Sequence, residues 1–219
     1  MNKIVIYGDS DLGKRMYQYM RLENAANVLC FTTAQAFMSK KEFCGLPVIA
    51  AEELAKHYDI DSFSILIAVG YSKINTIRRR IYQECKDAGF RIASFISKSA
   101  QIDTEDVGEG CIILPHCYVG PGCKLGICNI MSGGVMITHD CTIGNFNYIS
   151  AASVLGGHSH ITDNCFIGLN STIKDGITIA PYSLLGSAAN VVKSTEEYGI
   201  YVGNPARMLP ERSSLNAKI

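Results

Sequence analysis

The sequence predicts a small parallel α/β domain followed by an all-β solenoid. Residues 1 to about 96 alternate short apolar runs with amphipathic helical patterns, whereas aliphatic residues recur at every sixth position from about residue 99 onward. A content of 47% hydrophobic and 18% charged residues describes a chain able to bury a core. The expected domains are 1–96 for the α/β part, 97–195 for the solenoid and 196–219 for a C-terminal loop and tail.

The expected strands of the first domain are continuous apolar runs, as found where both faces of a sheet are covered. They lie at residues 4–7, 28–31, 65–69 and 92–95. Helical patterns separate them at 12–22, 51–57 and 73–88. The last pattern is followed by Gly89, and glycine commonly ends a helix.

A turn bracketed by Gly8 and Gly13 joins the first expected strand to the first expected helix. Backbone N–H groups and the helix dipole can bind a phosphate at such a turn, which makes Gly8, Ser10 and Gly13 candidate substrate-binding residues. A dinucleotide fingerprint would have another glycine at Ser10 and an acidic residue at the end of the second strand, where Phe31 is followed by two threonines. A tight turn without a ligand is the alternative.

The solenoid prediction depends on an unbroken six-residue period. Neither the helical period of 3.6 nor the heptad matches it. Three hexads suit one triangular coil of about 18 residues, and coils would stack at the strand spacing of about 4.8 Å. The repeat occupies the following aliphatic positions: Val107, Ile113, Val119, Leu125, Met131, Ile137, Ile143, Ile149, Leu155, Ile161, Ile167, Ile173, Ile179, Leu185 and Val191.

The residues two positions before these aliphatic residues should also point inward, because alternate residues of a strand share a face. Small residues dominate there, as the limited space inside a coil requires. Among them are Cys111, Cys117, Cys123, Cys141, Cys165, Ser153, Ser159, Ser171, Ser183 and Ala189. The cysteines of this phase are therefore expected to be small apolar residues of the solenoid interior.

Composition excludes several other classes of protein. Twenty basic residues balance twenty acidic ones, so no basic excess favours a nucleic-acid or membrane partner. No apolar stretch has the length of a spanning helix, and the N-terminus lacks the pattern of a signal peptide. Nine cysteines without such a signal argue against a disulfide framework, and none has zinc-ligand spacing, so we expect a cytoplasmic protein with no metal site.

The hexad run, closed by Tyr-Val-Gly-Asn-Pro-Ala-Arg at 201–207, resembles the hexapeptide-repeat acyltransferases. With an α/β domain in front, the whole chain is similar to the branch that contains sialic acid O-acetyltransferases and N-acetyltransferases of nucleotide-linked 4-amino sugars. The resemblance implies a Rossmann-like α/β domain followed by an all-β left-handed parallel β-helix. It also implies a homotrimer that binds acetyl-CoA between neighbouring β-helices and a sugar nucleotide with help from the N-terminal domain.

The catalytic segment of that family is similar to Ile-Thr-His-Asp-Cys-Thr-Ile-Gly at residues 137–144. The resemblance places the general base on His139, with Asp140 as its acidic neighbour. The period supports an outward His139, which lies off both inward-facing positions. Gly157, one coil later, matches a glycine whose N–H binds the thioester carbonyl in the family. The alternative is a solvated turn histidine.

Further site residues follow from the resemblance alone. Leu169, Ser187 and Ala188 match positions that line the pantetheine arm of the coenzyme, and Arg207 could meet a phosphate of CoA. Tyr148 stands nine residues after the expected base, where many members have a second histidine, and is a candidate for substrate binding. His158 and His160 also point outward one coil beyond the base, with a surface role as the alternative.

Three functional hypotheses remain at this point. The first is an acetyl-CoA-dependent O- or N-acetyltransferase that acts on a sugar, expected to be nucleotide-linked, in the synthesis of bacterial surface glycans; a non-sugar acceptor is a variant of it. The second is a non-catalytic trimeric scaffold or ligand-binding protein. The third is a zinc carbonic anhydrase on the same solenoid, whose histidine intervals are not reproduced by His116, His139, His158 and His160.

Overall fold

The computed structural model describes residues 2–210 and 212–217 and divides the chain into two compact units. The first unit holds the residues up to Gly70 together with Arg80–Ser94. The second holds Tyr71–Arg79 together with the residues from Phe95 onward. Helix α3 (Thr76–Asp87) therefore begins in the second unit and ends in the first. No helix within the described residues combines the length and the apolar character needed to cross a membrane.

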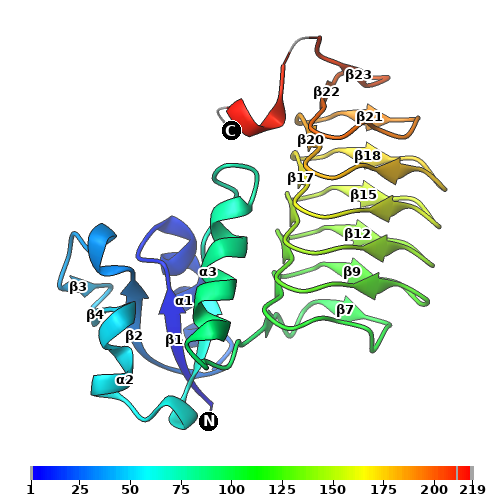
Figure 1. Ribbon diagram of the computed structural model, residues 1–219. Helices are drawn as coiled ribbons and strands as arrows, with labels where there is room; N and C mark the ends of the chain where they lie inside the picture. Colours follow the sequence, from blue (N-terminus) through cyan, green and yellow to red (C-terminus); the bar gives the residue numbers. More distant parts are fainter. Residues whose placement is uncertain (1, 211, 218–219) are drawn as a thin grey trace. The chain divides into compact units, whose positions relative to one another are not determined.

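The first unit contains a five-stranded sheet with the order β3-β4-β2-β1-β5 (Figure 1). Its paired strands run parallel, except that β3 and β4 are antiparallel. The strands are β1 (Lys3–Tyr7), β2 (Asn27–Thr33), β3 (Glu42–Phe43), β4 (Leu46–Ala50) and β5 (Ser64–Ile67). The helices are α1 (Asp11–Leu22), η1 (Gln35–Phe37), η2 (Ala51–Glu53), α2 (Leu54–His57) and η3 (Ile60–Ser62). The predicted parallel sheet is thus present.

Two expected elements differ from the structure. The run at 92–95 does not form a strand of this sheet; only an isolated parallel bridge joins Ile92 to Ile65, and the following β6 (Phe95–Ile96) belongs to the solenoid. Helix α3 starts at Thr76 and not at the predicted Lys73, because Lys73, Ile74 and Asn75 have φ angles of 49°, 49° and 65°. These left-handed residues cannot continue a right-handed helix.

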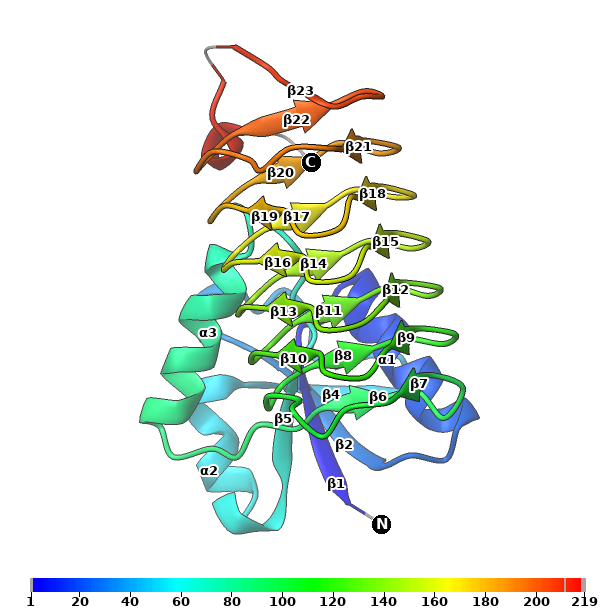
Figure 2. The ribbon, with the colours of Figure 1, turned by 90° about the vertical axis from the view of Figure 1, so that its right-hand side faces the viewer.

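The second unit is a β-helix in which short strands stack in three columns (Figure 2). Each column is named here after one of its strands as the β12, β13 or β14 face. The β12 face holds β7 (Gln101–Ile102), β9 (Tyr118–Val119), β12 (Met136–Ile137), β15 (Val154–Leu155), β18 (Thr172–Ile173) and β21 (Asn190–Val191). The β13 face holds β10 (Lys124–Leu125), β13 (Thr142–Ile143), β16 (His160–Ile161) and β19 (Thr178–Ile179). The β14 face holds β6, β8 (Ile112–Ile113), β11 (Ile130–Met131), β14 (Tyr148–Ile149), β17 (Phe166–Ile167), β20 (Leu184–Leu185), β22 (Ile200–Val202) and β23 (Arg207–Met208).

The register of the stack confirms the six-residue period. Ile137 pairs in parallel with Leu155, three hexads further along the chain, and Leu155 pairs with Ile173 in the same way. Every repeat aliphatic from Ile113 to Val191 is buried and is the second residue of its strand, whereas Val107 is half-buried. The small residues two positions earlier are buried as well, including all five cysteines of that phase.

Burial also changes the acidity of the interior thiols. Desolvation raises the pKa of Cys165 to about 12 and the pKa of Cys111 to about 11. These side chains stay neutral at physiological pH and act as small apolar residues. All nine cysteines of the chain are thiols, and all but Cys44 are buried.

Stacking continues beyond both ends of the hexad run. At the start, Phe95 pairs with Ile112, and this spacing is shorter than a full coil. At the end, Leu184 pairs with Ile200, and the ring of Tyr201 packs against the core. After β22 the chain turns back, and β23 runs antiparallel to β22.

The segment Tyr71–Arg79 packs on the outer side of the β14 face. The ring of Tyr71 lies edge-on to the rings of Tyr148 and Phe166, each with a centroid distance of 4.9 Å. Arg78 is 1% exposed, and its guanidinium donates to the carbonyls of Cys128, Phe146 and Asn147 at 2.9 to 3.2 Å. Burial lowers the pKa of Arg78 to about 10, so the group stays charged at neutral pH.

The three faces therefore differ in what covers them. On the β14 face, the outward residues of β8, β11, β14, β17 and β20 are buried, among them Ile130, Tyr148 and Phe166. The β13 face carries polar outward residues such as Thr142 and Thr178. On the β12 face, Tyr118, Met136 and Val154 form an outward apolar row in consecutive coils, and Met136 is 45% exposed.

Candidate active site

His139 and Asp140 lie on the corner that joins the β12 face to the β13 face. Ile137 and Cys141 on either side of them point into the core and are fully buried. Of the three residues between them, Thr138 is half-buried, whereas His139 and Asp140 point outward with side chains that are 54% and 53% exposed. The predicted outward orientation of His139 is therefore present.

Asp140 is held over a glycine of the coil before it. Its backbone has a φ of 53°, and its N–H donates to the carbonyl of Pro121 at 3.0 Å. A Cβ on Gly122 would lie 2.3 Å from Oδ1 of Asp140. Because Gly122 has no side chain, the carboxylate of Asp140 can occupy the space beside it.

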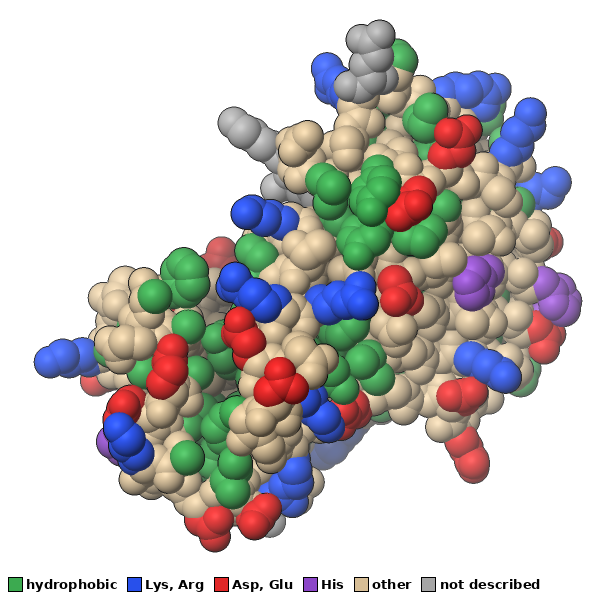
Figure 3. Space-filling model, in the orientation of Figure 1, with side chains coloured by type: hydrophobic (Ala, Val, Ile, Leu, Met, Phe, Trp, Pro, Cys, Tyr) green, Lys and Arg blue, Asp and Glu red, His purple; other side chains and the backbone are tan. Residues whose placement is uncertain are grey.

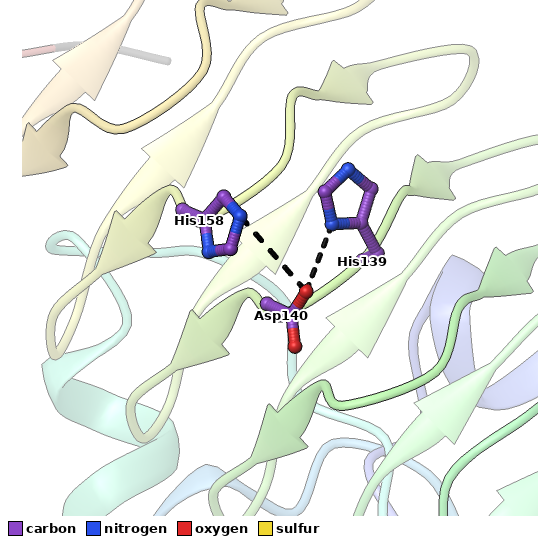
Figure 4. A group of neighbouring side chains, drawn as sticks. All are labelled: His139, Asp140 and His158. Carbon is purple, nitrogen blue, oxygen red and sulfur yellow. Dashed lines mark hydrogen bonds and ion pairs between the residues drawn. The ribbon is translucent and has the colours of Figure 1, made fainter.

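The imidazole of His139 is fixed from two sides. Nδ1 lies 2.9 Å from Oδ2 of Asp140, the distance of a charge-assisted hydrogen bond (Figure 4). On the other side, a Cβ on Gly157 would lie 2.5 Å from both Cε1 and Nε2. A carboxylate on Nδ1 favours the tautomer that carries its proton on Nδ1, which leaves a lone pair on Nε2.

Gly157 lies one coil after His139, as the hexad period predicts. Its carbonyl accepts from the N–H of Gly176 at 2.9 Å, and the carbonyl of His139 accepts from the N–H of His158 at 3.1 Å. The N–H of Gly157 itself donates to no acceptor among residues 2–210 and 212–217. A buried glycine beside an imidazole thus keeps an unused backbone donor.

His158 joins this pair. Its Nε2 lies 4.0 Å from Oδ2 of Asp140, and its ring stands at 89° to the ring of His139 with a centroid distance of 5.1 Å. Its side chain is 68% exposed, and histidine side chains are visible on the surface of the solenoid unit in Figure 3. Asp140 and His158 are one coil apart in the sequence, and this interval predicts that they lie at the same place in consecutive coils. His160 lies on the β13 face, paired with Thr142, and outside this group.

The residues expected to line the pantetheine arm meet at another corner of the same face. Leu169, Ser187 and Ala188 are exposed on the corner that joins the β14 face to the β12 face. The N–H of Ala188 donates to the carbonyl of Leu169 at 2.8 Å. The exposed β12 face therefore lies between this corner and the corner of His139.

Two other expected site residues stand apart from His139. Tyr148 is 6% exposed, its ring packs between Tyr71 and Phe166, and Ser132 Oγ donates to its hydroxyl at 3.4 Å. Within one chain Tyr148 thus has a packing role on the β14 face. Arg207 is exposed on β23, where its Nη1 donates to the carbonyl of Ala206 at 3.0 Å.

The turn after β1 is as tight as its glycines suggest. Gly8 has a φ of 123°, and a Cβ on Gly13 would lie 1.9 Å from the carbonyl oxygen of Gly8. Both glycines are therefore required by close backbone approach. Ser10 is the N-cap residue of α1 but makes no capping hydrogen bond with its side chain, and Lys40 donates to the carbonyl of Asp9 at 2.8 Å.

No profile of a known protein family matches this chain. Solved structures do resemble it. The acetyltransferase domain of PglB from Neisseria gonorrhoeae FA1090 is 23% identical and gives a TM-score of 0.84 over 95% of this chain and 100% of that chain. WeeI from Acinetobacter baumannii AYE gives the same TM-score, identity and coverage.

PerB from Caulobacter crescentus, solved in complex with CoA and GDP-perosamine, is 21% identical with a TM-score of 0.84. The alignment covers 95% of this chain and 98% of PerB. The resemblance to sugar acetyltransferases expected from the sequence thus recurs among the structural neighbours. At these identities the likeness establishes the fold, a β-helix preceded by an α/β unit.

Proposed function

We propose that the protein is an acetyl-CoA-dependent acetyltransferase that modifies a hydroxyl or amino group of a nucleotide-linked sugar in bacterial surface-glycan synthesis. One observation carries the proposal: the His139 imidazole is bonded to Asp140 on one side and lies against Gly157 on the other, at an exposed corner of a β-helix. PglB and PerB support the choice of reaction, because they share the fold and are an acetyltransferase domain and a protein solved with CoA and a sugar nucleotide.

The proposed reaction follows from the groups on the two sides of the His139 imidazole, Asp140 and Gly157. Asp140 accepts the Nδ1 proton, so Nε2 of His139 can remove the proton of the acceptor as its oxygen or nitrogen attacks the thioester carbon. The N–H of Gly157 then donates to the oxyanion that develops on the former carbonyl. When the tetrahedral intermediate collapses, the C–S bond breaks and the imidazolium returns the proton to the departing CoA thiolate. No acyl-enzyme forms.

The coenzyme is proposed to lie along a groove made by two copies of the chain. The β12 face supports this arrangement, because Tyr118, Met136 and Val154 form an uncovered apolar row between the His139 corner and the corner of Leu169, Ser187 and Ala188. A second copy that packs there would bury the row and leave the two corners at the edges of the contact. We infer a homotrimer of left-handed β-helices, with Arg207 near a phosphate of CoA.

The α/β unit is proposed to be Rossmann-like and to hold the acceptor. Its strand β1 ends at the turn of Gly8, Ser10 and Gly13, where helix α1 begins with its N-terminal N–H groups and a Ser10 hydroxyl that makes no capping hydrogen bond. Lys40 lies beside this turn, where its Nζ is 3.6 Å from Oδ2 of Asp9. We propose a cytoplasmic location, which the nine thiols fit because disulfides are rare there.

The test uses the purified chain with acetyl-CoA and a panel of sugar nucleotides, with product masses and CoA release as readouts. For any acceptor found, His139→Ala should lower kcat by about a hundredfold to ten-thousandfold, as removal of a general base does. Thermal shifts by acetyl-CoA should persist in that variant, because the proposed groove lies beside the imidazole.

The matched control is His160→Gln, which changes a nearby histidine outside the site and should keep wild-type turnover. Equal turnover by His139→Ala and wild type would overturn the mechanism. Failure of acetyl-CoA to shift the melting temperature of the wild type would overturn the assignment as an acetyltransferase.

A further inference from the structure

His139, Asp140 and His158 together offer the donor set of a transition-metal site. One atom from each side chain can be chosen so that all three lie within 4.8 Å of one another. Two imidazole nitrogens and a carboxylate oxygen are ligands that Zn²⁺ accepts. Within residues 2–210 and 212–217, no other cluster of three histidine, cysteine, aspartate or glutamate side chains meets this spacing.

The distances between these donors fit a shared ion after small side-chain movements. Ligand atoms on a tetrahedral Zn²⁺ with bonds of about 2.0 Å lie about 3.3 Å apart. Here Oδ2 of Asp140 lies 2.9 Å from Nδ1 of His139 and 4.0 Å from Nε2 of His158. The two observed distances lie on either side of the ideal one, and the side chains of His158 and Asp140, which are 68% and 53% exposed, can adjust while His139 keeps its place.

The backbone keeps the donors on one side of the corner. Asp140 and His158 have φ angles of 53° and 57° and occupy the same place in consecutive coils, with Gly122 and Gly176 in the coils before and after them. A Cβ added at Gly176 would meet nothing within 4 Å, so the space beside His158 is open. The remaining coordination positions of an ion would therefore face water.

We propose that His139, Asp140 and His158 bind a divalent transition metal such as Zn²⁺, and that the bound ion switches off the acetyl transfer. The binding site stands on geometry alone, whereas the inhibition rests on the proposed function. An ion bound at Nδ1 of a neutral His139 forces the ring proton onto Nε2, which then has no lone pair to accept a proton. The ion would also take the Asp140 carboxylate that holds the catalytic tautomer.

Binding is tested without any activity measurement. The metal-stripped chain is titrated with Zn²⁺ against a chromophoric chelator and with Co²⁺, whose visible absorption reports nitrogen and oxygen ligands in a site of low coordination number. Removing even the hydrogen-bond partner of a metal ligand costs about tenfold to a hundredfold in affinity, so His158→Gln should weaken Zn²⁺ binding by at least as much. His160→Gln is the matched control and should bind like wild type.

A second arm measures acetyl transfer at increasing Zn²⁺. Wild type and His160→Gln should be inhibited and recover with a chelator, whereas His158→Gln, measured against its own metal-free rate, should need about tenfold or more Zn²⁺ for the same inhibition. Equal Zn²⁺ affinity in wild type and His158→Gln would overturn the site. Zn²⁺ binding that leaves turnover unchanged would overturn the switch, and Zn²⁺ binding in a chain without transferase activity would overturn the proposed function but not the site.

Discussion

The imidazole of His139 occupies the space that a side chain at position 157 would need. A Cβ on Gly157 would lie 2.5 Å from Nε2 and from Cε1 of that ring. The orientation of the proposed base His139 therefore depends on the absence of a side chain at Gly157. Adding one methyl group at position 157 tests this dependence.

Gly157→Ala should displace the ring and lower kcat by about a hundredfold, the cost of misplacing a catalytic group by about 1 Å. The φ of Gly157 is not in the left-handed region, so the fold should be kept. Steady-state kinetics and a thermal melt measure the two effects. Gly133→Ala, at the equivalent place on another corner, is the control and should retain turnover; full activity of Gly157→Ala would refute the arrangement.

Met136→Glu should break the proposed homotrimer. Met136 is 45% exposed in the middle of the apolar row of the β12 face, and burying a carboxylate there would cost several kcal/mol. Light scattering should show a mass near 23.8 kDa instead of three times that value. Thr178→Glu introduces the same charge on the polar β13 face and should leave the trimer intact. A wild-type chain that scatters as a monomer would contradict the trimer itself.

Arg78→Met should destabilise the solenoid unit by about 3 kcal/mol or more, because it removes a charged donor from three backbone carbonyls of the β14 face. Urea unfolding measures the loss. Arg79→Met is the control, since Arg79 is exposed and its hydrogen bonds to Asn164 and Tyr182 are 3.4 and 3.5 Å long. Comparable losses in the two variants would show that the buried guanidinium has no special role.

Stability should fall as the pH rises above about 9. Burial raises the pKa of Cys165 from 9.0 to about 12 and that of Cys111 to about 11, so the unfolded chain releases these protons first. At pH values between the pKa of a thiol in the unfolded chain and its pKa in the folded chain, the unfolded state binds fewer protons than the folded state. The free energy of unfolding therefore decreases as the pH rises. Each such thiol should account for about 1 kcal/mol between pH 8 and pH 10.

Cys165→Ser isolates this contribution, because Ser183 already occupies the equivalent place one coil later. Urea unfolding in reducing buffer should give a shallower loss of stability with pH for the variant than for wild type. Identical slopes would mean that the Cys165 thiol does not take part in the pH dependence.

The solenoid and the position of its proposed base could be predicted because the hexad period determines which residues face inward. The period also places Gly157 one coil after His139 and therefore beside it. The ends of the stack could not be predicted in this way, because the pairs of Phe95 with Ile112 and of Leu184 with Ile200 use spacings shorter than a full coil. At the C-terminal end, the ring of Tyr201 packs against the core outside the hexad repeat.

Other features depend on contacts that a sequence pattern does not contain. The left-handed turn at Lys73, Ile74 and Asn75 is not evident from the sequence, because a β-branched residue is a poor candidate for positive φ. Ile74 and Asn75 are buried there, and Asn75 donates to the carbonyl of Cys165 at 2.9 Å. By contrast, the place of His158 over Asp140 follows from the interval of one coil between them, as the place of Gly157 beside His139 does.

The constant register of the coils also bears on how such a chain can change over generations. The proposed centre spans only the three consecutive coils that hold Gly122, His139 and Gly157. A duplication of eighteen codons beyond Ile179 would lengthen the stack by one coil and leave every neighbour of His139 in place. Insertion of a single codon would instead turn the aliphatic residues that follow it outward, so whole coils are the units by which this half of the gene can grow or shrink.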